Sequence, residues 1–378
     1  MDIGLYIHIP FCKSRCIYCD FYSTTLREEW QIPYVEALER EMTLRAHSQS
    51  SEIKTLYIGG GTPSLLIAKV LRHLFSSIRR HFCIADDAEV TIEANPDDVT
   101  LQWVEQLMDF PINRVSMGVQ SLNDEILRTL HRRHTARQAL EAVSLLQDAG
   151  LTNLSLDLIY GLPGQSLVQF QSDVRELLAL GIPHLSAYAL QFEPGTQLYE
   201  MREAGTISEA DDELSLSCYE SLIDLTAQAG MEHYEISNFA RMGFRSRHNS
   251  SYWTGAPYLG LGAGAHSYDG LRTRSFNCNS VHRYISSMRS GIDCSTSENL
   301  NDTELYNERI MLGLRTCEGI NLCAIERDFG SQRLQHCREM AAPHIRSGKL
   351  RFRPSDNSLC LTRLGLFVSD GIISDLME

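Results

Sequence analysis

The side chains with the clearest chemical potential are three closely spaced thiols near the start of the chain, Cys12, Cys16 and Cys19. Thiolates bind soft metal centres, and a [4Fe-4S] cluster needs four ligands, so three cysteines leave one iron open to a small molecule. The apolar run at residues 5–9, which Pro10 ends, predicts a buried strand and places the thiols on the loop at its carboxyl end. The spacing therefore predicts a metal-binding loop, with a [4Fe-4S] cluster as one candidate.

Two other uses of these thiols compete with the cluster. A zinc ion would take a fourth ligand from His8 or Asp20. Disulfides are disfavoured because the chain is long, begins without a signal peptide and has an odd number of cysteines, 11 in all. The remaining cysteines form no tight cluster, and we expect them to be free thiols. They are Cys83, Cys218, Cys278, Cys294, Cys317, Cys323, Cys337 and Cys360.

Length and composition indicate a globular protein with one large domain and a smaller one. The chain has 378 residues, of which 43% are hydrophobic and 22% are charged. No stretch is long and apolar enough to span a bilayer, so we expect a cytoplasmic protein with at most peripheral membrane contact. The formal net charge of −14 disfavours nucleic acid as a partner, because phosphate binding needs clustered Lys and Arg.

Six short apolar segments alternate with helical patterns along the first part of the chain. This alternation predicts βαβ units and a parallel sheet. Six units are too few for a closed eight-stranded barrel, so the expected fold class is α/β, with an open, partial (β/α)6 barrel over residues 1–233. Polar and glycine residues follow the strands, which predicts one functional edge. The expected strands cover residues 5–9, 55–58, 89–93, 114–120, 154–160 and 184–190.

The pattern changes beyond the sixth strand. Residues 234–280 are rich in glycine and polar residues, which predicts a loop-rich connecting region. Residues 281–378 predict a smaller α+β domain that resembles a winged helix, in which Thr362 caps a final helix. In an acidic chain we expect this domain to be structural or to bind a partner rather than DNA. Its expected helices lie near 281–289 and 302–314, and its hairpin pairs 350–353 with 359–361.

Several strand ends carry residues suited to binding a nucleotide-like ligand. The run Gly59-Gly60-Gly61-Thr62-Pro63 lets backbone groups approach an amine and a carboxylate closely, although it is also typical of a tight turn. Glu93 ends the third strand, where it can accept hydrogen bonds from ribose hydroxyls or be a simple charged terminus. Gln120 and Asp157 occupy the corresponding places on later strands. A carboxylate between two leucines, as at Asp157, is costly unless it is paired or ligand-bound.

These segments resemble the radical S-adenosylmethionine (SAM) family that contains the oxygen-independent coproporphyrinogen III oxidase and related haem chaperones. The resemblance covers nearly the whole chain. Its markers are Tyr6-Ile7-His8-Ile9-Pro10-Phe11-Cys12, Gly59-Gly60-Gly61-Thr62-Pro63, Glu93-Ala94-Asn95-Pro96, Ser116-Met117-Gly118-Val119-Gln120 and Asp157-Leu158-Ile159-Tyr160-Gly161-Leu162-Pro163-Gly164.

The resemblance also implies which residues bind the cofactors. Cys12, Cys16 and Cys19 would bind a [4Fe-4S] cluster whose open iron takes exchangeable SAM. Contacts to this SAM would come from Tyr6, Gly60 and Glu93. A second SAM position would be formed by Tyr18, Gly61, Thr62, Gln120, Arg132 and Asp157.

Two sequence features differ from the oxidase and are similar to those of the haem chaperones. The oxidase pattern has a further cysteine two places after the third, where this chain has Phe21, and this chain begins almost at its first strand. The run His248-Asn249-Ser250-Ser251-Tyr252-Trp253 matches an H-N-x-x-Y-W motif associated with haem in those chaperones. From the residues alone, His248 could ligate haem iron with Tyr252 and Trp253 stacked on the macrocycle, or all three could pack a loop.

Two functions follow from the resemblance. One is a chaperone that binds haem and the SAM-coordinated cluster and passes haem to acceptor proteins, with His266 as a rival to His248 for the iron. The other is an enzyme that cleaves SAM and oxidises a porphyrin precursor. The retained SAM positions favour the oxidase, whereas Phe21 and the haem-associated motif favour the chaperone. We therefore expect the chaperone function and no oxidase activity. The expected partners are haem, haem-accepting proteins and a second copy of the chain, with the cluster gating transfer or dimerisation.

Overall fold

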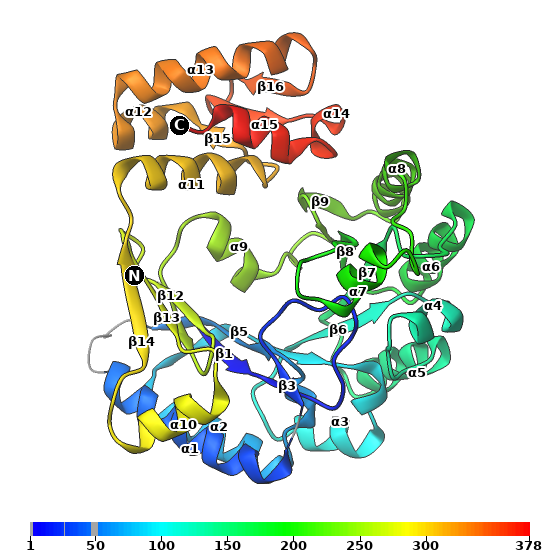
Figure 1. The fold of residues 1–378 in the computed structure, drawn as a ribbon, viewed down its shortest axis with the longest axis vertical. Helices are drawn as coiled ribbons and strands as arrows, with labels where there is room; N and C mark the ends of the chain where they lie inside the picture. The colour runs from blue at the N-terminus through cyan, green and yellow to red at the C-terminus, as the bar shows by residue number, and fades with distance from the viewer. Residues whose placement is uncertain (1–2, 26, 47–51) are drawn as a thin grey trace.

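The computed structural model describes residues 3–25, 27–46 and 52–378, and contains one large sheet with a smaller unit beside it (Figure 1). The sheet has twelve strands in the order β14-β13-β12-β11-β1-β4-β5-β6-β7-β8-β10-β9. Within the described ranges its two edge strands do not pair with each other, so the barrel is open. Helices cover the outer face of the curved sheet, and the inner face surrounds α9 (Figure 1).

The six central strands are parallel and confirm the six that the sequence predicts. Their side chains are apolar on both faces because helices cover one face and the barrel interior the other. Leu5, Ile7, Leu56 and Leu156 are fully buried. The strands are β1 Ile3–Ile9, β4 Ile53–Gly60, β5 Ile84–Ala94, β6 Arg114–Gln120, β7 Leu154–Tyr160 and β8 His184–Ala189.

Helices connect these strands and pack on the outer face. Side-chain caps hold the first turns of α3 to α8, as where Thr135 and Gln138 form a reciprocal capping box at the start of α5. No helix of the described part of the chain combines the length and apolar character needed to cross a bilayer. The helices of this layer are α1 Gln31–Ala46, α2 Ala68–His81, α3 Leu101–Leu107, α4 Asp124–Thr129, α5 Ala136–Asp148, α6 Leu167–Ala179, α7 Gln197–Glu203 and α8 Asp212–Gln228, with short 3-10 turns η1 Glu28–Trp30, η2 Pro63–Leu65 and η3 Pro96–Asp98.

Additional short strands extend the sheet at both ends, so the expectation of a loop-rich connection over residues 234–280 is wrong. At one end β11 runs parallel to β1, and an antiparallel hairpin series follows it. At the other end β10 pairs antiparallel with β8, and β9 pairs with β10. Strands this short carry little periodicity, and their pairing with a distant strand decides their conformation. They are β9 Glu232–Glu235, β10 Asn238–Ala240, β11 Tyr258–Leu261, β12 His266–Tyr268, β13 Thr273–Asn277 and β14 Ser295–Asn299, with α9 Arg247–Trp253 between β10 and β11.

A second hydrophobic core begins at Tyr306 and defines the smaller C-terminal unit. This unit starts later than the expected boundary at 281, because α10 (Val281–Arg289) buries Val281 and Tyr284 in the main core. Its three short strands lie in the order β15-β17-β16. Its elements are α11 Asp302–Leu314, β15 Ile320–Asn321, α12 Leu322–Phe329, α13 Ser331–Arg346, β16 Leu350–Arg353, β17 Ser358–Leu361, α14 Arg363–Leu366 and α15 Ser369–Leu376.

The predicted hairpin is present, but Thr362 does not cap the helix that follows it. The Thr362 hydroxyl instead donates to the carbonyl oxygen of Gly348 at 2.6 Å. This carbonyl belongs to the turn between α13 and β16, so the hydroxyl is directed towards that turn and not towards the N–H groups of the helix. The threonine therefore closes the base of the hairpin.

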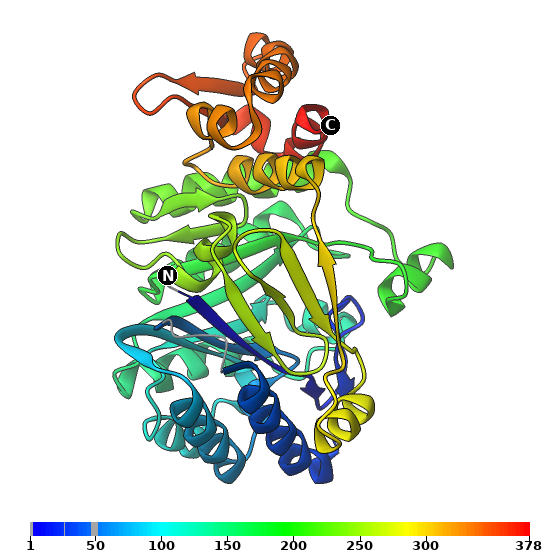
Figure 2. The ribbon, with the colours of Figure 1, turned by 90° about the vertical axis from the view of Figure 1, so that its left-hand side faces the viewer.

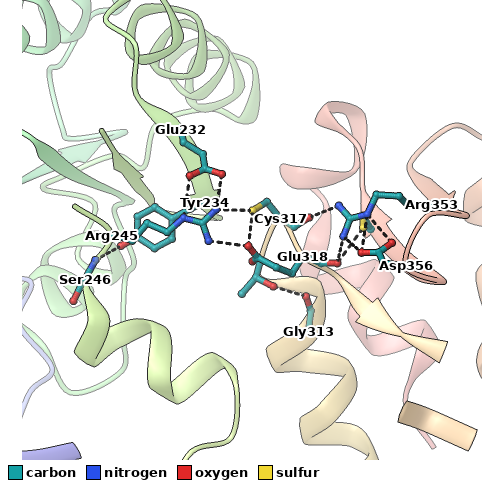
Figure 3. A network of polar contacts seen from close by, with 11 residues as sticks. Glu232, Tyr234, Arg245, Ser246, Gly313, Cys317, Glu318, Arg353 and Asp356 are labelled. Atoms are coloured by element: carbon teal, nitrogen blue, oxygen red, sulfur yellow. Dashed lines mark hydrogen bonds and ion pairs between the residues drawn. The ribbon is translucent and has the colours of Figure 1, made fainter. Parts of the chain in front are cut away.

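Polar contacts attach the C-terminal unit to the sheet (Figure 3). Arg245, which precedes α9, donates to Glu232 at 2.9 Å and to Glu318 of the C-terminal unit at 2.7 Å. The backbone N–H of Cys317 donates to the carbonyl oxygen of Tyr234 at 3.0 Å. These contacts set the position of the unit, whose first helix, α11, lies across one end of the sheet (Figure 2).

Candidate functional site

The thiol loop closes on itself at the carboxyl end of β1. The short strands β2 (Phe11–Cys12) and β3 (Thr24–Thr25) pair in parallel, and the N–H of Thr24 donates to the carbonyl oxygen of Pro10 at 2.7 Å. Pro10 cannot continue the β1 ladder, so the chain turns there into the loop. The loop faces the carboxyl ends of β4 to β7, as the sequence predicts.

One cavity of about 190 Å³, the cluster cavity, lies between this loop and the strand ends. It brings together eleven of the twelve residues expected to bind the cluster and SAM; only Tyr6 is absent. The eleven are Cys12, Cys16, Tyr18, Cys19, Gly60, Gly61, Thr62, Glu93, Gln120, Arg132 and Asp157.

The three thiols are held by neighbours in the cluster cavity. The Thr62 hydroxyl donates to Cys12 Sγ at 3.5 Å, and the Arg132 guanidinium donates to Cys16 Sγ at 3.4 Å. Burial raises the pKa of Cys12 and raises the pKa of Cys19 to about 11, so both are neutral thiols until a metal displaces their protons.

The arrangement of these thiols fits an iron–sulfur cluster better than zinc. Within the described residues, no three His, Cys, Asp or Glu side chains converge as one metal ion would require. Cluster ligands bind separate irons and can be further apart. The three cysteines line one cavity, so Cys12, Cys16 and Cys19 would hold a [4Fe-4S] cluster there if it binds.

The glycines at the end of β4 are required by close packing. Gly60 has φ of +113°, and a Cβ there would lie 2.5 Å from the His8 ring. A Cβ on Gly61 would lie 2.8 Å from the carbonyl oxygen of Phe11. A side chain at Gly60 would displace the His8 ring, and one at Gly61 would push the start of the thiol loop away from the end of β4.

Glu93 is oriented by two hydrogen bonds. Its carboxylate accepts from the Tyr57 hydroxyl at 2.8 Å and from the backbone N–H of Gly60 at 2.9 Å. Burial raises the pKa of Glu93. A buried carboxylate that faces a cavity suits a ligand with hydroxyl or ammonium donors, such as those that SAM carries.

A polar cluster around Arg132 forms the far wall of the cluster cavity. Its guanidinium donates to the side-chain oxygen of Asn95 at 2.8 Å and to the carbonyl oxygen of Gly118. Gln120 closes this wall with φ of +68°, a strained conformation for a residue other than glycine. Burial raises the pKa of Asp157 to about 7. This wall is therefore polar, preformed and partly strained.

A second cavity, the interdomain cavity, lies beyond the thiol loop and has a volume of about 1090 Å³. Its walls come from β1, α9 and β11 to β13 on the sheet side and from α11 to α13 on the side of the C-terminal unit. Tyr6 lines this cavity, and its hydroxyl pairs with His8 Nδ1 at 2.9 Å. Phe21 lines both cavities and is 67% exposed. The thiol loop is thus the partition between them.

The structure corrects the expectation that His248 is an open haem ligand. His248 is buried in the barrel interior and lines neither cavity. Its Nδ1 pairs with the Thr55 hydroxyl and its Nε2 with the Tyr252 hydroxyl, both at 2.8 Å. Burial lowers the pKa of His248 to about 3. Both ring nitrogens are occupied, so the histidine orients Tyr252 and anchors α9 instead of facing a ligand.

The other residues considered for haem do line the interdomain cavity: Tyr252, Trp253 and His266. The His266 ring makes no hydrogen bond within the described part of the chain, and its centroid is 5.7 Å from that of Phe276. Burial, with help from Arg274, lowers the pKa of His266, which keeps the imidazole neutral and its lone pair available. His8 also lines the cavity, but both of its ring nitrogens are hydrogen-bonded.

Several residues of the two cavities were not predicted from the sequence. Asn95 bridges Arg132 and Thr62, and its place two residues after Glu93 on the same strand end could have identified it. Four arginines of the interdomain cavity come from three segments that are far apart in the sequence, so no local pattern connects all four. They are Arg272, Arg274, Arg309 and Arg333.

Comparison with known proteins identifies the family. Residues 6–177 match the radical SAM superfamily, and residues 300–368 match the HemN C-terminal domain. The heme chaperone HemW of Lactococcus lactis is 36% identical over 344 residues, which cover 86% of this chain and 87% of that protein. The chain belongs to the HemW family of radical SAM proteins. Membership of the radical SAM superfamily implies SAM and a [4Fe-4S] cluster.

Other HemW proteins and one solved structure extend this comparison. The heme chaperone HemW of Mycobacterium tuberculosis is 34% identical over 379 residues, covering 99% of this chain and 94% of that protein. The HemW protein of Escherichia coli is 40% identical over 268 residues, covering 70% and 69%. The fold is similar to that of the Escherichia coli coproporphyrinogen III oxidase HemN, with a TM-score of 0.86 at 22% identity over 100% of this chain and 90% of that chain.

Proposed function

We propose that this protein is a haem chaperone that binds haem in the interdomain cavity and a SAM-coordinated [4Fe-4S] cluster in the cluster cavity. The observation that carries the proposal is the interdomain cavity of about 1090 Å³, which adjoins the cluster cavity across Phe21. Its volume is at the upper end of ordinary ligand sites, as a large macrocycle requires. The names of the HemW relatives agree with this function.

The haem would use two kinds of contact. Tyr252, Trp253 and Phe21 offer aromatic faces to the macrocycle, and His266 offers an imidazole nitrogen to the iron. His248 contributes indirectly, because its hydrogen bond orients the Tyr252 hydroxyl. This assignment keeps the haem-associated motif in the site and replaces the expected axial ligand.

In the cluster cavity, Cys12, Cys16 and Cys19 would hold the cluster, which supplies electron transfer when bound. Glu93 and Gly60 would orient SAM from the end of β4 and β5, since the carboxylate is already held by the Gly60 N–H. Tyr18, Gly61, Thr62, Gln120, Arg132 and Asp157 line the same cavity and would form the second SAM position. Tyr6 lies on the side of the interdomain cavity and would contact ligands there.

The retained SAM-binding wall favours a second candidate function, a radical SAM oxidase that acts on a porphyrin precursor. Its cavity would be the same, because a porphyrin precursor has nearly the size of haem. Phe21 argues against it, since the oxidase pattern has cysteine at that place.

The test is a haem titration of the anaerobically reconstituted protein, followed by mixing with a haem-free acceptor protein. We expect a saturable change in the haem absorption band at one haem per chain, and transfer that depends on contact with the acceptor. Absence of saturable binding would reject the chaperone function.

A parallel assay separates the two functions. The reconstituted protein is incubated with coproporphyrinogen III, SAM and a reductant, and the expected result is no decarboxylation. Turnover would make the oxidase the correct assignment. Light scattering before and after haem loading would test homodimer formation, and fractionation of cells would test the proposed cytoplasmic location.

A further inference from the structure

The interdomain cavity has two chemically different sides. The side formed by the sheet and α9 carries aromatic residues, among them Tyr252, Trp253 and Tyr258. Where the sheet meets the C-terminal unit, the cavity carries four arginines, two at and just before the start of β13 and two on α11 and α13. Each of them pairs with a carboxylate: Arg272 with Asp302, Arg274 with Glu308, Arg309 with Asp328 and Arg333 with Glu378. An apolar face of a ligand would therefore suit the aromatic side, and an anionic group at the other side would need an arginine that still has an unused donor.

Arg274 has unused hydrogen-bonding capacity in this cavity. Its Nη2 pairs with Glu308 of α11 at 2.8 Å. Its Nε is buried and has no hydrogen-bond partner in the part of the chain that the structure describes. A guanidinium has five N–H donors in a planar fork, which can bind a second carboxylate while it keeps the first.

Arg309 presents a second guanidinium nearby. It pairs with Asp328 at 3.3 Å, and its Cζ lies 5.9 Å from the Phe329 ring centroid. Glu308, which precedes Arg309 on α11, pairs with Arg274 at 2.8 Å, and both arginines line the interdomain cavity. The two arginines therefore flank the same end of the cavity.

We propose that Arg274 and Arg309 bind the carboxylates of the macrocycle, so that the cavity selects a planar ligand with two adjacent carboxylate arms. This inference rests on the proposed function, because haem is the ligand with that chemistry. Charged hydrogen bonds in a partly desolvated cavity are strong enough to fix which edge of the ligand enters first. With the carboxylate edge against the C-terminal unit, the apolar face of the macrocycle lies against α9.

Glu308 offers a way to distinguish ligand binding by Arg274 from a purely structural role of the Arg274–Glu308 pair. Glu308 pairs with Arg274 across the boundary between the sheet and the C-terminal unit, so the pair could simply hold the two together. If so, removing either charge would have the same effect. If Arg274 binds the ligand, Glu308 competes with the ligand, and removing its charge has the opposite effect.

The experiment titrates iron protoporphyrin IX and its dimethyl ester into the full-length, cluster-loaded protein and four variants. Wild type is expected to bind the ester about tenfold more weakly than haem, as loss of a charge-assisted pair predicts. Arg274→Gln should lose about tenfold in haem affinity and bind the ester as wild type does, and Arg274→Lys should recover part of the loss. Glu308→Gln should bind haem as tightly as wild type or more tightly.

Arg363→Gln is the matched control, because Arg363 also joins the C-terminal unit to the sheet domain, through Asp224 of α8, but lies outside the cavity. It should leave both affinities unchanged. Equal binding of haem and ester by wild type would overturn the carboxylate inference and leave haem binding intact, as would an equal loss in Arg274→Gln and Glu308→Gln. If wild type binds neither ligand, the proposed function and this inference both fail.

Discussion

The two cavities on either side of the thiol loop differ in how they are built. The cluster cavity is formed by one loop and successive strand ends of a single sheet, and its lining is mostly polar or sulfur-containing. The interdomain cavity has a volume of about 1090 Å³, more than five times the volume of the cluster cavity, which is about 190 Å³. It is enclosed by two units, the sheet and the C-terminal unit. Hydrogen bonds orient the groups of the first cavity before any ligand binds, whereas the second offers broad aromatic walls.

The two kinds of cavity suit two different tasks, the binding of a cofactor and the binding of cargo. A small cavity with fixed donors suits a cofactor whose position must be set accurately. A large cavity between two units suits bulky cargo, because it offers a broad surface contributed by both units. Phe21 is the side chain that both cavities share, so it is where the two tasks meet.

The largest expected effect concerns the three thiols, whose loss should affect the cluster cavity but not the interdomain cavity. We expect Cys12→Ala, Cys16→Ala and Cys19→Ala each to lose nearly all iron and sulfide, because a cluster with two protein ligands is not retained. Haem affinity should stay within about twofold of wild type, since no thiol lines the interdomain cavity. Iron and sulfide assays and a haem titration measure both. Cys83→Ala, at an exposed free cysteine, is the control; full cluster content in any of the three variants would refute the assignment.

The two histidines should respond differently. His266→Ala is expected to change the haem absorption band and to weaken haem binding by about tenfold or more, as loss of an axial ligand would. His248→Ala should keep the wild-type haem spectrum but lower the free energy of unfolding by about 2 to 4 kcal/mol, because it leaves the Thr55 and Tyr252 hydroxyls unpaired inside the barrel. Spectral titration and urea unfolding measure these effects. The reverse pattern would restore His248 as the ligand.

Asp157 makes the cluster cavity sensitive to pH. Burial raises the pKa of Asp157 to about 7 from an ordinary value of 3.8, so the folded protein holds this proton more tightly than the unfolded chain. The protonated carboxyl contributes fully to the free energy of unfolding below the pKa of the unfolded chain. This contribution is lost as the pH rises to the pKa of the folded protein. Relative to Asp157→Asn, the wild-type protein without cofactors should therefore lose about 3 to 4 kcal/mol of unfolding free energy between pH 4 and pH 8. Parallel pH dependence of the two proteins would contradict the raised pKa.

The smallest expected effect concerns Phe21, the side chain of the thiol loop that lines both cavities. Phe21→Ala removes an exposed ring that lines both cavities, so it should leave the melting temperature unchanged within about 2 °C. It should speed the loss of the cluster in air by a few-fold, because oxygen and solvent reach the cluster cavity from the interdomain side. Decay of the cluster absorption measures this rate. Phe21→Leu should behave like wild type, and an unchanged rate in the alanine variant would show that the ring is no barrier.

The sequence alone predicted the parts of the protein that local patterns encode. The alternation of apolar strands and amphipathic helices predicted six parallel strands, and each of them is present. Glu93, Gln120 and Asp157 could be predicted because they lie at strand ends, and the carboxyl ends of parallel strands meet at one edge. Tyr18 and Arg132 lie outside the strands, and only the resemblance to the family implied them. Of the twelve expected residues, Tyr6 alone lines the interdomain cavity instead, because strand side chains alternate and the sequence does not say which face turns towards which cavity; its contact with SAM stays a prediction.

The tertiary structure decided what depends on distant segments. The short strands between 234 and 280 form only because β1 and β8 offer free edges, and the C-terminal unit starts at about Tyr306 because α10 packs in the main core. His248 looked like an exposed ligand in its motif, but Thr55 from β4 occupies its ring and buries it. The interdomain cavity and its arginines arise where two units meet, and the free energy of such contacts depends on packing that no local pattern records.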